Sequence, residues 1–389
     1  MSAKHAVKAG LGACAVIAGA FVATAVVTYQ YAANNADRPR WVHSLNFVQA
    51  HGKTYLKTPT GGFPDHPGEL SLRTTHGGLI RLSPPVTSPG GEFTFREVTP
   101  TVQQPSMIPT TGAFTGHLGE TPGDFGLTWE DCVVGGSPAW RVQPNTPPAD
   151  VSVWAIHLHG HGSRRSQTLR SVTTLSNQGA TSLVPTGRTS HDHAHPSRRS
   201  TLGREEWKDL RAAHDYALRN GATHILYVGW SLGAIHALRI ITHHSRENVA
   251  GAIFVSPAVD IAEAITASLH RLRIPKLLAL AIALLGGLLH GAHPGWTIKD
   301  ELHSLARDPI PMLILQGEAD RTVPFEITSR VLSAAGLRPQ IQRFAKANHT
   351  LEYNADPELW EATIARWYSR HIQAQRQFEE NSQQEELNS

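Results

Sequence analysis

The sequence predicts an α/β protein, because short apolar runs of strand-forming residues are followed by loops and then by helix-forming segments. Residues 223–228 form such a run, and residues 232–243 after it carry apolar side chains around most of a helix. Residues 151–158 and 311–316 are further runs that lead into glycine-containing loops. Apolar runs of this length are typical of parallel strands buried on both faces.

The segment Gly229-Trp230-Ser231-Leu232-Gly233 lies between the first of these strands and its helix. It has the G-x-S-x-G form, in which a serine on a sharp turn exposes its hydroxyl to a substrate. Glycines two residues away on either side let neighbouring chain pass without a Cβ clash. We therefore expect Ser231 to be a nucleophile; the alternative is a glycine-rich turn with a solvent-facing serine.

A serine hydroxyl needs a histidine to take its proton and a carboxylate to orient that histidine. Asp320 falls in the loop after an apolar run that ends at Gly317, and His349 follows the short predicted strand 341–344. The order Ser, Asp, His is the one found in hydrolases that use this kind of turn. Two other carboxylates remain alternatives for the acid, Glu318 and Asp260.

A glycine-rich loop, His159-Gly160-His161-Gly162, follows the predicted strand 151–158. Such a loop can direct a backbone N–H at a developing oxyanion, and the N–H of Leu232, next to the serine, is the second candidate donor. We expect the His159 side chain to hold the loop in place, and His161 to contribute its backbone more than its ring.

Together these motifs resemble the α/β-hydrolase superfamily. They are H-G-x-G at 159–162, the serine turn at 229–233, G-x-x-D-x-x-V-P at 317–324 and Asn348-His349, in the family's order, within residues 124–375. Within the superfamily the chain is similar to bacterial esterases and lysophospholipase-like members, including the serine aminopeptidase-like branch.

The resemblance implies an eight-stranded, mostly parallel sheet with helices on both faces. It also implies roles for the site: Ser231 as nucleophile, His349 as base, Asp320 as orienting acid, the amides of His161 and Leu232 as oxyanion donors, and His159, Gly160, Gly229 and Gly233 as supporting residues. The expected function is that of a serine hydrolase, carboxylesterase- or lipase-like, which forms an acyl-enzyme and needs no metal or organic cofactor. The alternatives are a serine peptidase or amidase with the same triad, or a non-catalytic binding protein of this fold.

The charge and the cysteine and histidine content of the sequence limit the partners and ligands that we expect. The 389-residue chain has a formal net charge of +3 and no basic stripe, so nucleic acid is not an expected partner. Its two cysteines, Cys14 and Cys132, form no metal or disulfide framework.

Three alternating histidines with Asp192 at residues 190–195 are either a solvated surface loop, which we favour, or ligands of a transition metal. Nothing in the sequence specifies an oligomeric state.

The first 31 residues are expected to be a membrane anchor or a signal sequence. No charged residue occurs between Lys8 and Asp37, and residues 9–29 are apolar enough and long enough to span a bilayer. Lys4 and Lys8 favour a cytoplasmic N-terminus, which would place the enzyme outside the cytoplasm as a single-pass protein of the cell membrane. The alternative is secretion after cleavage near residues 23–25.

Three further segments complete the predicted organisation. Residues 32–123 are rich in Pro and Gly and are expected to form an irregular extension with short strands at 79–82 and 92–96. Residues 261–308 are the predicted cap, and the apolar run 277–289 within it either covers an acyl pocket or touches lipid. Residues 376–389 form a polar tail. The expected substrate is a small acyl ester, with a lipid as one candidate.

Overall fold

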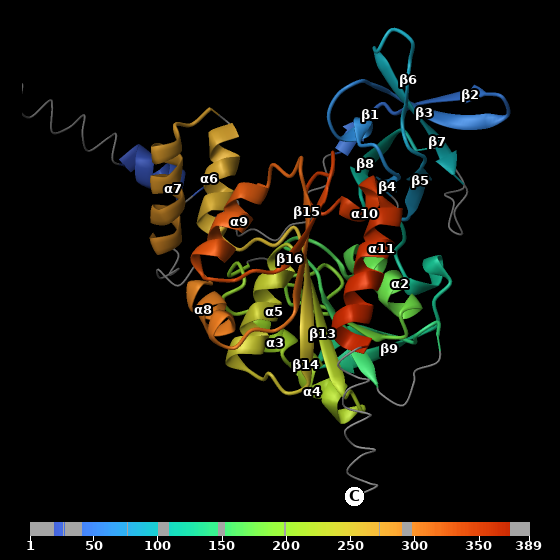
Figure 1. The fold of residues 1–389 in the computed structure, drawn as a ribbon. Helices are drawn as coiled ribbons and strands as arrows, with labels where there is room; N and C mark the ends of the chain where they lie inside the picture. Colours follow the sequence, from blue (N-terminus) through green and yellow to red (C-terminus); the bar gives the residue numbers. More distant parts are fainter. Residues whose placement is uncertain are drawn as a thin grey trace, which may run out of the picture.

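Two eight-stranded sheets organise the protein in its computed structural model (Figure 1). One is built from residues 41–115 and is antiparallel, and the other carries the strands predicted for the α/β core. The structure describes residues 19–25, 27, 41–75, 77–99, 109–146, 152–197, 200–271, 273–289 and 298–373.

The central sheet has the order β16-β15-β14-β13-β11-β12-β10-β9. It is parallel from β12 to β16, whereas β10 runs antiparallel to both β12 and β9, so the sheet is mixed with a parallel majority. The strands are β9 (Trp129–Val134), β10 (Ser137–Val142), β11 (Val153–Leu158), β12 (Thr181–Pro185), β13 (His224–Trp230), β14 (Val249–Val255), β15 (Met312–Gly317) and β16 (Gln340–Phe344).

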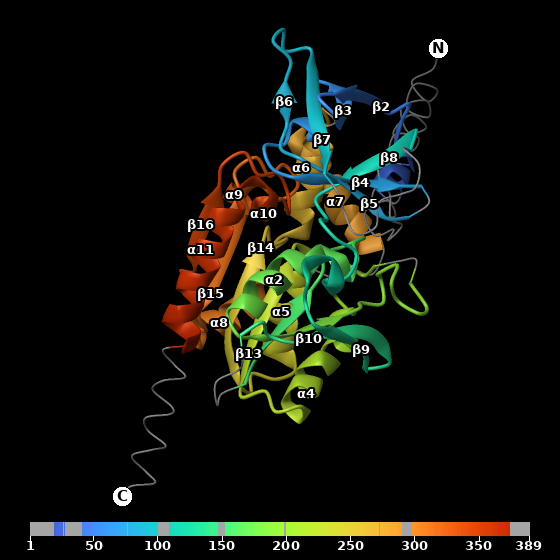
Figure 2. The same cartoon turned by 90° about the vertical axis from the view of Figure 1, so that its right-hand side faces the viewer.

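Helices cover both faces of this sheet, as predicted (Figures 1 and 2). Every residue of β13 is buried; Ile225 and Tyr227 belong to one core, and Leu226 and Val228 to the other. This alternation follows from the two-residue period of a strand. One face packs against α3 (Trp207–Leu210), α4 (Ala212–Arg219), α5 (Leu232–His243), α8 (Lys299–Arg307) and α9 (Phe325–Ala334), and the other against α2 (Leu169–Asn177) and α11 (Pro357–Tyr368).

The N-terminal segment is more regular than the sequence indicated. The two short strands predicted there are β5 and β7, and they belong to an antiparallel sheet of order β1-β8-β4-β5-β7-β3-β2, with β6 on β7. A small core with buried Leu56, Leu72, Ile80 and Leu82 stabilises it. The strands are β1 (Trp41–His43), β2 (Asn46–Ala50), β3 (Lys53–Pro59), β4 (Leu70–Thr74), β5 (Leu79–Leu82), β6 (Val86–Thr87), β7 (Phe93–Thr99) and β8 (Thr111–Thr115).

The predicted cap lies between β14 and β15. It contains α6 (Ile261–Arg271) and α7 (Lys276–Leu289), which pack side by side, followed by α8 (Figure 1). Residues 19–25 are helical and lie against this pair, where Ala25 shares a buried cluster with Leu269, Ala279 and Ile282. The rest of the predicted anchor, apart from residue 27, and the polar tail at 376–389 lie outside the described residues. Within the described part of the chain, no helix is both long and apolar enough to cross a bilayer.

The antiparallel sheet contacts the α/β core beside α10 (Glu352–Ala355). The Asn354 side-chain amide donates to the carbonyl oxygens of Glu69, at 2.8 Å, and Gly116, at 3.1 Å. A Cβ on Gly68 would lie 1.2 Å from the Asn354 carbonyl oxygen, so only glycine allows the two backbones to approach this closely.

We expect Gly68→Ala to separate these surfaces and to destabilise the protein by about 1–3 kcal/mol, the usual cost of overpacking. Thermal unfolding should show a melting temperature lowered by about 2 °C or more. Gly90→Ala is the control, because a Cβ there would have its nearest neighbour 3.9 Å away. Equal melting temperatures for the two variants would contradict this account of the contact.

Candidate active site

Ser231 lies between β13 and α5 in a strained backbone conformation, with φ 51° and ψ −112°. Non-glycine residues rarely adopt positive φ, and such strain persists only where the surroundings enforce it. Here the carbonyl oxygen of Val255 accepts a hydrogen bond from the Ser231 N–H at 2.9 Å, and the Ser231 carbonyl accepts from Ala234 and Ala258, each at 3.2 Å. The turn therefore has the strand–serine–helix geometry that the sequence predicted.

Close backbone contacts require the two glycines that flank the serine turn, and a third glycine lies close to it. A Cβ on Gly233 would lie 2.0 Å from the Leu158 carbonyl oxygen, and one on Gly229 would lie 2.5 Å from the Ala234 Cα. A Cβ on Gly160 would lie 3.2 Å from the Ser231 Cβ. The glycine-rich loop after β11 thus passes directly beside the serine.

His349 connects Ser231 to Asp320. The Ser231 hydroxyl donates to His349 Nε2 at 2.9 Å, and His349 Nδ1–H donates to Asp320 Oδ2 at 2.7 Å. Asp320 is buried, and its Oδ1 accepts the backbone N–H groups of Thr322 at 2.8 Å and Val323 at 2.9 Å. These donors hold the carboxylate in one orientation, which fixes the histidine tautomer that leaves Nε2 free to accept a proton.

The contacts of the three candidate carboxylates distinguish Asp320 from Asp260 and Glu318. Asp260 Oδ1 accepts the backbone N–H of Glu263 at 2.9 Å, at the start of α6. Glu318 forms an ion pair with Arg343 at 3.3 Å. Of these three carboxylates, Asp320 is the one hydrogen-bonded to His349.

The environment shifts both members of the His349–Asp320 pair toward the charged form. Burial lowers the pKa of His349, but the charge of Asp320 and its hydrogen bond outweigh this and hold the pKa above its usual value. Burial raises the pKa of Asp320, whereas the charge and hydrogen bond of His349 and the N–H of Val323 bring it below its usual value. A protonated His349 is therefore stabilised beside ionised Asp320.

The loop after β11 is held by side chains on both sides. Gly187 N–H donates to His159 Nε2 at 3.2 Å, so the proton lies on Nδ1, which donates to the Gly160 carbonyl at 2.9 Å. Gly160 N–H donates to Gln167 Oε1 at 2.8 Å. Leu232 begins α5, and the first N–H groups of a helix have no partner within it. The roles of Leu232 and His161 as oxyanion donors stay predictions.

Sequence reasoning missed several buried polar residues around the site. Besides Gln167, Arg170 on α2 donates to the carbonyl oxygens of Thr350, at 2.8 Å, and Gln167, at 3.1 Å, and so connects the two sides of the site. Ser256 and Glu352 lie behind Asp320. No local motif marks these residues, because a polar side chain in a helix or after a strand is typical of solvent-exposed positions.

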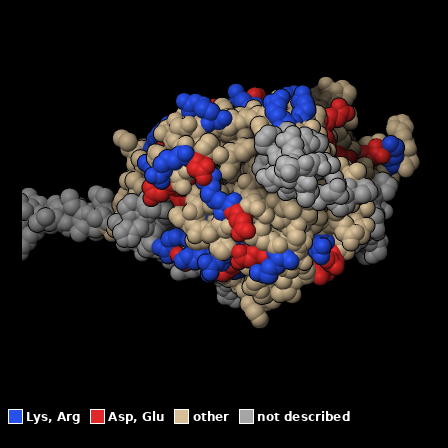
Figure 3. Space-filling model, turned by 60° about the horizontal axis from the view of Figure 1, so that its bottom comes forward, with Lys and Arg blue, Asp and Glu red and all other residues tan. Residues whose placement is uncertain are grey.

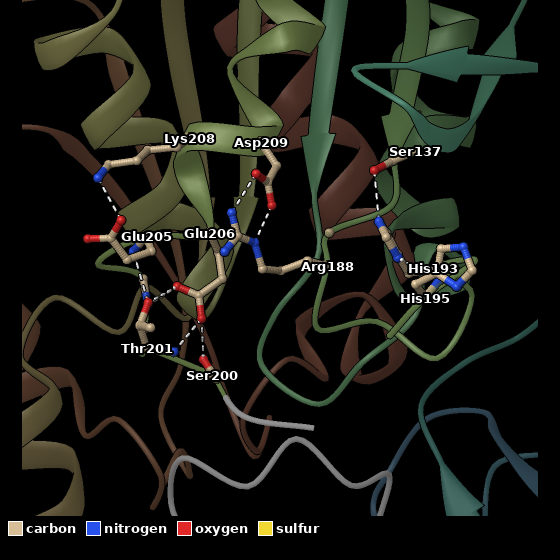
Figure 4. A network of polar contacts seen from close by, with 12 residues as sticks. Ser137, Arg188, His193, His195, Ser200, Thr201, Glu205, Glu206, Lys208 and Asp209 are labelled. Atoms are coloured by element: carbon tan, nitrogen blue, oxygen red, sulfur yellow. Dashed lines mark hydrogen bonds and ion pairs between the residues drawn. The ribbon is translucent and has the colours of Figure 1, made fainter. Parts of the chain in front are cut away.

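The histidine-rich loop at 190–195 forms structural contacts. His193 Nε2 lies 2.9 Å from the Ser137 hydroxyl, and His195 N–H donates to His193 Nδ1 at 3.0 Å (Figure 4). The Asp192 carboxylate lies 3.8 Å from the guanidinium groups of Arg164 and Arg165, and its Oδ2 accepts the backbone N–H of Arg165 at 3.2 Å. Among the described residues, no three His, Cys, Asp or Glu side chains could hold a metal ion together. The metal-binding alternative for this loop therefore has no geometric support.

Comparison with solved structures supports the fold. An esterase of Pyrococcus furiosus, Pf2001, is similar over 65% of this chain and 96% of its own, with a TM-score of 0.50 and 17% identity. Two weaker similarities have a TM-score of 0.46. A putative lipase from Acinetobacter baumannii has 16% identity and is similar over 64% of this chain and 92% of its own. A proline iminopeptidase of Mycobacterium smegmatis has 14% identity and is similar over 64% of this chain and 99% of its own. No family model and no curated protein matches the sequence. The chain has the α/β-hydrolase fold.

Asp320→Asn should lower kcat by about 10³- to 10⁴-fold, because the histidine tautomer is no longer fixed. Asp260→Asn is the matched control and should leave kcat within a few-fold of the unmodified protein, since Asp260 contacts α6 rather than His349. Steady-state kinetics on an activated ester, with circular dichroism to check the fold, measures both. A larger loss for the Asp260 variant would overturn the assignment of the acid.

Proposed function

We propose that the chain is a serine hydrolase that cleaves an ester bond through an acyl-enzyme, in the manner of a carboxylesterase or lipase. The observation that supports this most directly is the continuous hydrogen-bonded series Ser231–His349–Asp320, with the serine on a strained turn at the start of a helix. On the face in Figure 3, Lys and Arg lie among Asp and Glu and form no continuous basic stripe, so this face gives no support for nucleic-acid binding.

The proposed reaction follows from this geometry. As Ser231 Oγ attacks the carbonyl carbon, its proton passes to His349 Nε2, and the carbonyl electron pair moves onto oxygen beside the N–H groups of Leu232 and His161. The tetrahedral intermediate then expels the alcohol, which takes the proton from His349. Water, deprotonated by His349, attacks the acyl-enzyme in the same way and releases the acid.

Two alternatives remain. A serine peptidase or amidase would use the same triad on an amide, and a binding protein of this fold would not turn over substrate. Panels of p-nitrophenyl esters and aminoacyl anilides separate the three. We expect ester hydrolysis at a kcat/KM well above that of the anilides, and Ser231→Ala should lower kcat by about 10⁴-fold or more. Preferred cleavage of anilides would favour a peptidase, and no turnover of either would favour the binding protein.

An apolar surface on the cap supports an acyl substrate of lipid character. Leu277 is 84% exposed and Leu284 54% exposed, and both lie on α7, beside the helical residues 19–25 (Figure 1). Exposed leucines at this density are typical of surfaces that meet a membrane or another apolar partner. Lys276 is exposed at the start of the same helix and Arg273 is exposed in the turn before it, where both can contact anionic headgroups.

We further propose that the N-terminal apolar segment anchors the protein in the cell membrane with the catalytic domain outside the cytoplasm; secretion after cleavage is the alternative. The sequence of residues 9–29 and the preceding Lys4 and Lys8 support this. Protease added to intact cells would then digest the catalytic domain, and full protection would contradict the orientation.

Replacing both Leu277 and Leu284 with Ser should weaken turnover of long-chain esters in anionic vesicles by about tenfold or more, since burial of each leucine stabilises by about 1.5–3 kcal/mol. Turnover of a soluble acetate ester should be unchanged, because neither side chain belongs to the triad. Val133→Ser is the control, as this β9 side chain is 68% exposed but distant from the cap in sequence and fold. Equal loss on both esters would exclude a role of α7 in lipid contact.

A further inference from the structure

A second carboxyl group lies behind the triad. Glu352 begins α10, three residues after His349, and its side chain is fully buried. Its Oε1 accepts the backbone N–H of Gly317 at 3.0 Å and the hydroxyl of Ser256. Gly317 ends β15 and Ser256 follows β14, so Glu352 lies across the carboxyl ends of two central strands. An acidic side chain is rarely buried completely without a structural or functional reason.

Ser256 connects this carboxyl group to the site. It is fully buried with a positive φ of 45°, and its N–H donates to the Leu315 carbonyl at 2.9 Å. Its hydroxyl donates to Glu352 and also helps to lower the pKa of Asp320, and its Oγ accepts the N–H of Thr350 at 3.3 Å. The hydroxyl therefore lies between the two carboxyl groups and is bonded to the residue that follows His349.

The charged groups around Glu352 come from three elements. Asp320 lies in the loop after β15, His349 in the loop after β16, and the buried guanidinium of Arg170 on α2. Burial raises the pKa of Glu352 to about 7, although its hydrogen bond to Ser256 lowers it, and the negative charge of Asp320 raises it further. Among the described residues, Glu352 Oε2 has no hydrogen-bond partner. The group can thus gain or lose a proton in the pH range where a histidine base works.

We propose that Glu352, connected to the triad through Ser256, is a positioning residue that stabilises the protonated imidazole of His349. The inference rests on the proposed function in one respect, that His349 takes a proton during the reaction. Asp320 supplies the direct contact, and ionised Glu352 adds a second negative charge behind it. Glu352 touches neither Ser231 nor the substrate position in this scheme, so it acts only through the histidine.

The consequence is a coupled titration. In the unmodified protein, the negative charge of ionised Glu352 favours the protonated form of His349 without direct contact, so His349 stays protonated to higher pH. Without the second charge, His349 loses its proton at lower pH. The imidazolium is then also less stable in the transition state, which lowers kcat at pH values where the histidine is already neutral.

Glu352→Gln tests this directly, because the amide oxygen can still accept the bonds from Ser256 and Gly317. We expect the acid limb of kcat/KM against pH to shift down by about half a unit or more, and kcat on the high-pH plateau to fall by about three- to tenfold, with KM unchanged. Glu361→Gln is the matched control: Glu361 is a half-buried carboxyl on α11, bonded to Thr174 and not to the triad. This variant should show neither change.

A loss of kcat in Glu352→Gln with a pH profile identical to that of the unmodified enzyme would mean a purely structural role and would overturn the proposal. The proposal would also be overturned if Glu352→Gln left both the kcat on the high-pH plateau and the acid limb of kcat/KM unchanged. If Glu352→Gln does not fold, NMR titration of the His349 ring in the unmodified protein decides: we expect a curve that departs from a single ionisation, with an inflection near pH 7. A single-site curve would refute the coupling. The same titration remains informative if no ester is cleaved, so failure of the proposed function is distinguishable from failure of this inference.

Discussion

The backbone of Ser231 is the constraint on which the rest of the site depends. A positive φ at a serine costs of order 1–3 kcal/mol and persists only because the surrounding chain enforces it. Here the restraint comes from hydrogen bonds to Val255, Ala234 and Ala258, and from glycines that let β11, β13 and α5 approach within van der Waals contact. The fixed serine then sets where His349 and the glycine-rich loop at 159–162 must lie.

Parallel strands make this arrangement possible, because their carboxyl ends meet at one edge of the sheet. Ser231 follows β13, the His159 loop follows β11, Asp320 follows β15 and His349 follows β16. Each side chain comes from a different loop. The loops after β11, β13 and β15 follow fully buried strands, whereas His349 follows the edge strand β16, in which Phe344 is the buried residue. The same edge also holds Ser256 and Glu352, which explains how a second carboxyl group comes to lie behind the first.

The sequence was sufficient for those features that have local causes. The serine turn needs glycines at fixed spacing, and fully buried strands appear as uninterrupted apolar runs, so β11, β13 and β15 and the residues after them could be predicted. The sequence favoured Asp320 as the acid but left Asp260 and Glu318 as alternatives, because all three lie near strand ends. The hydrogen bond to His349 distinguishes them.

Other features depend on contacts between distant segments. The N-terminal sheet is made of short strands with a small core, and its Pro and Gly content resembles that of an irregular segment. The polar residues Gln167, Arg170 and Glu352 are buried only because α2, α10 and the loops after the strands pack together. No periodicity of a single segment carries that information.

The central claim is that Ser231 is the nucleophile of an acyl-transfer reaction. The most direct measurement is the mass of the intact protein after reaction with a fluorophosphonate, followed by peptide mapping of the adduct. The account predicts one adduct per chain, on the peptide that contains Ser231, and no adduct after prior heat unfolding. An adduct on another residue of the folded protein, or none at all, would contradict it.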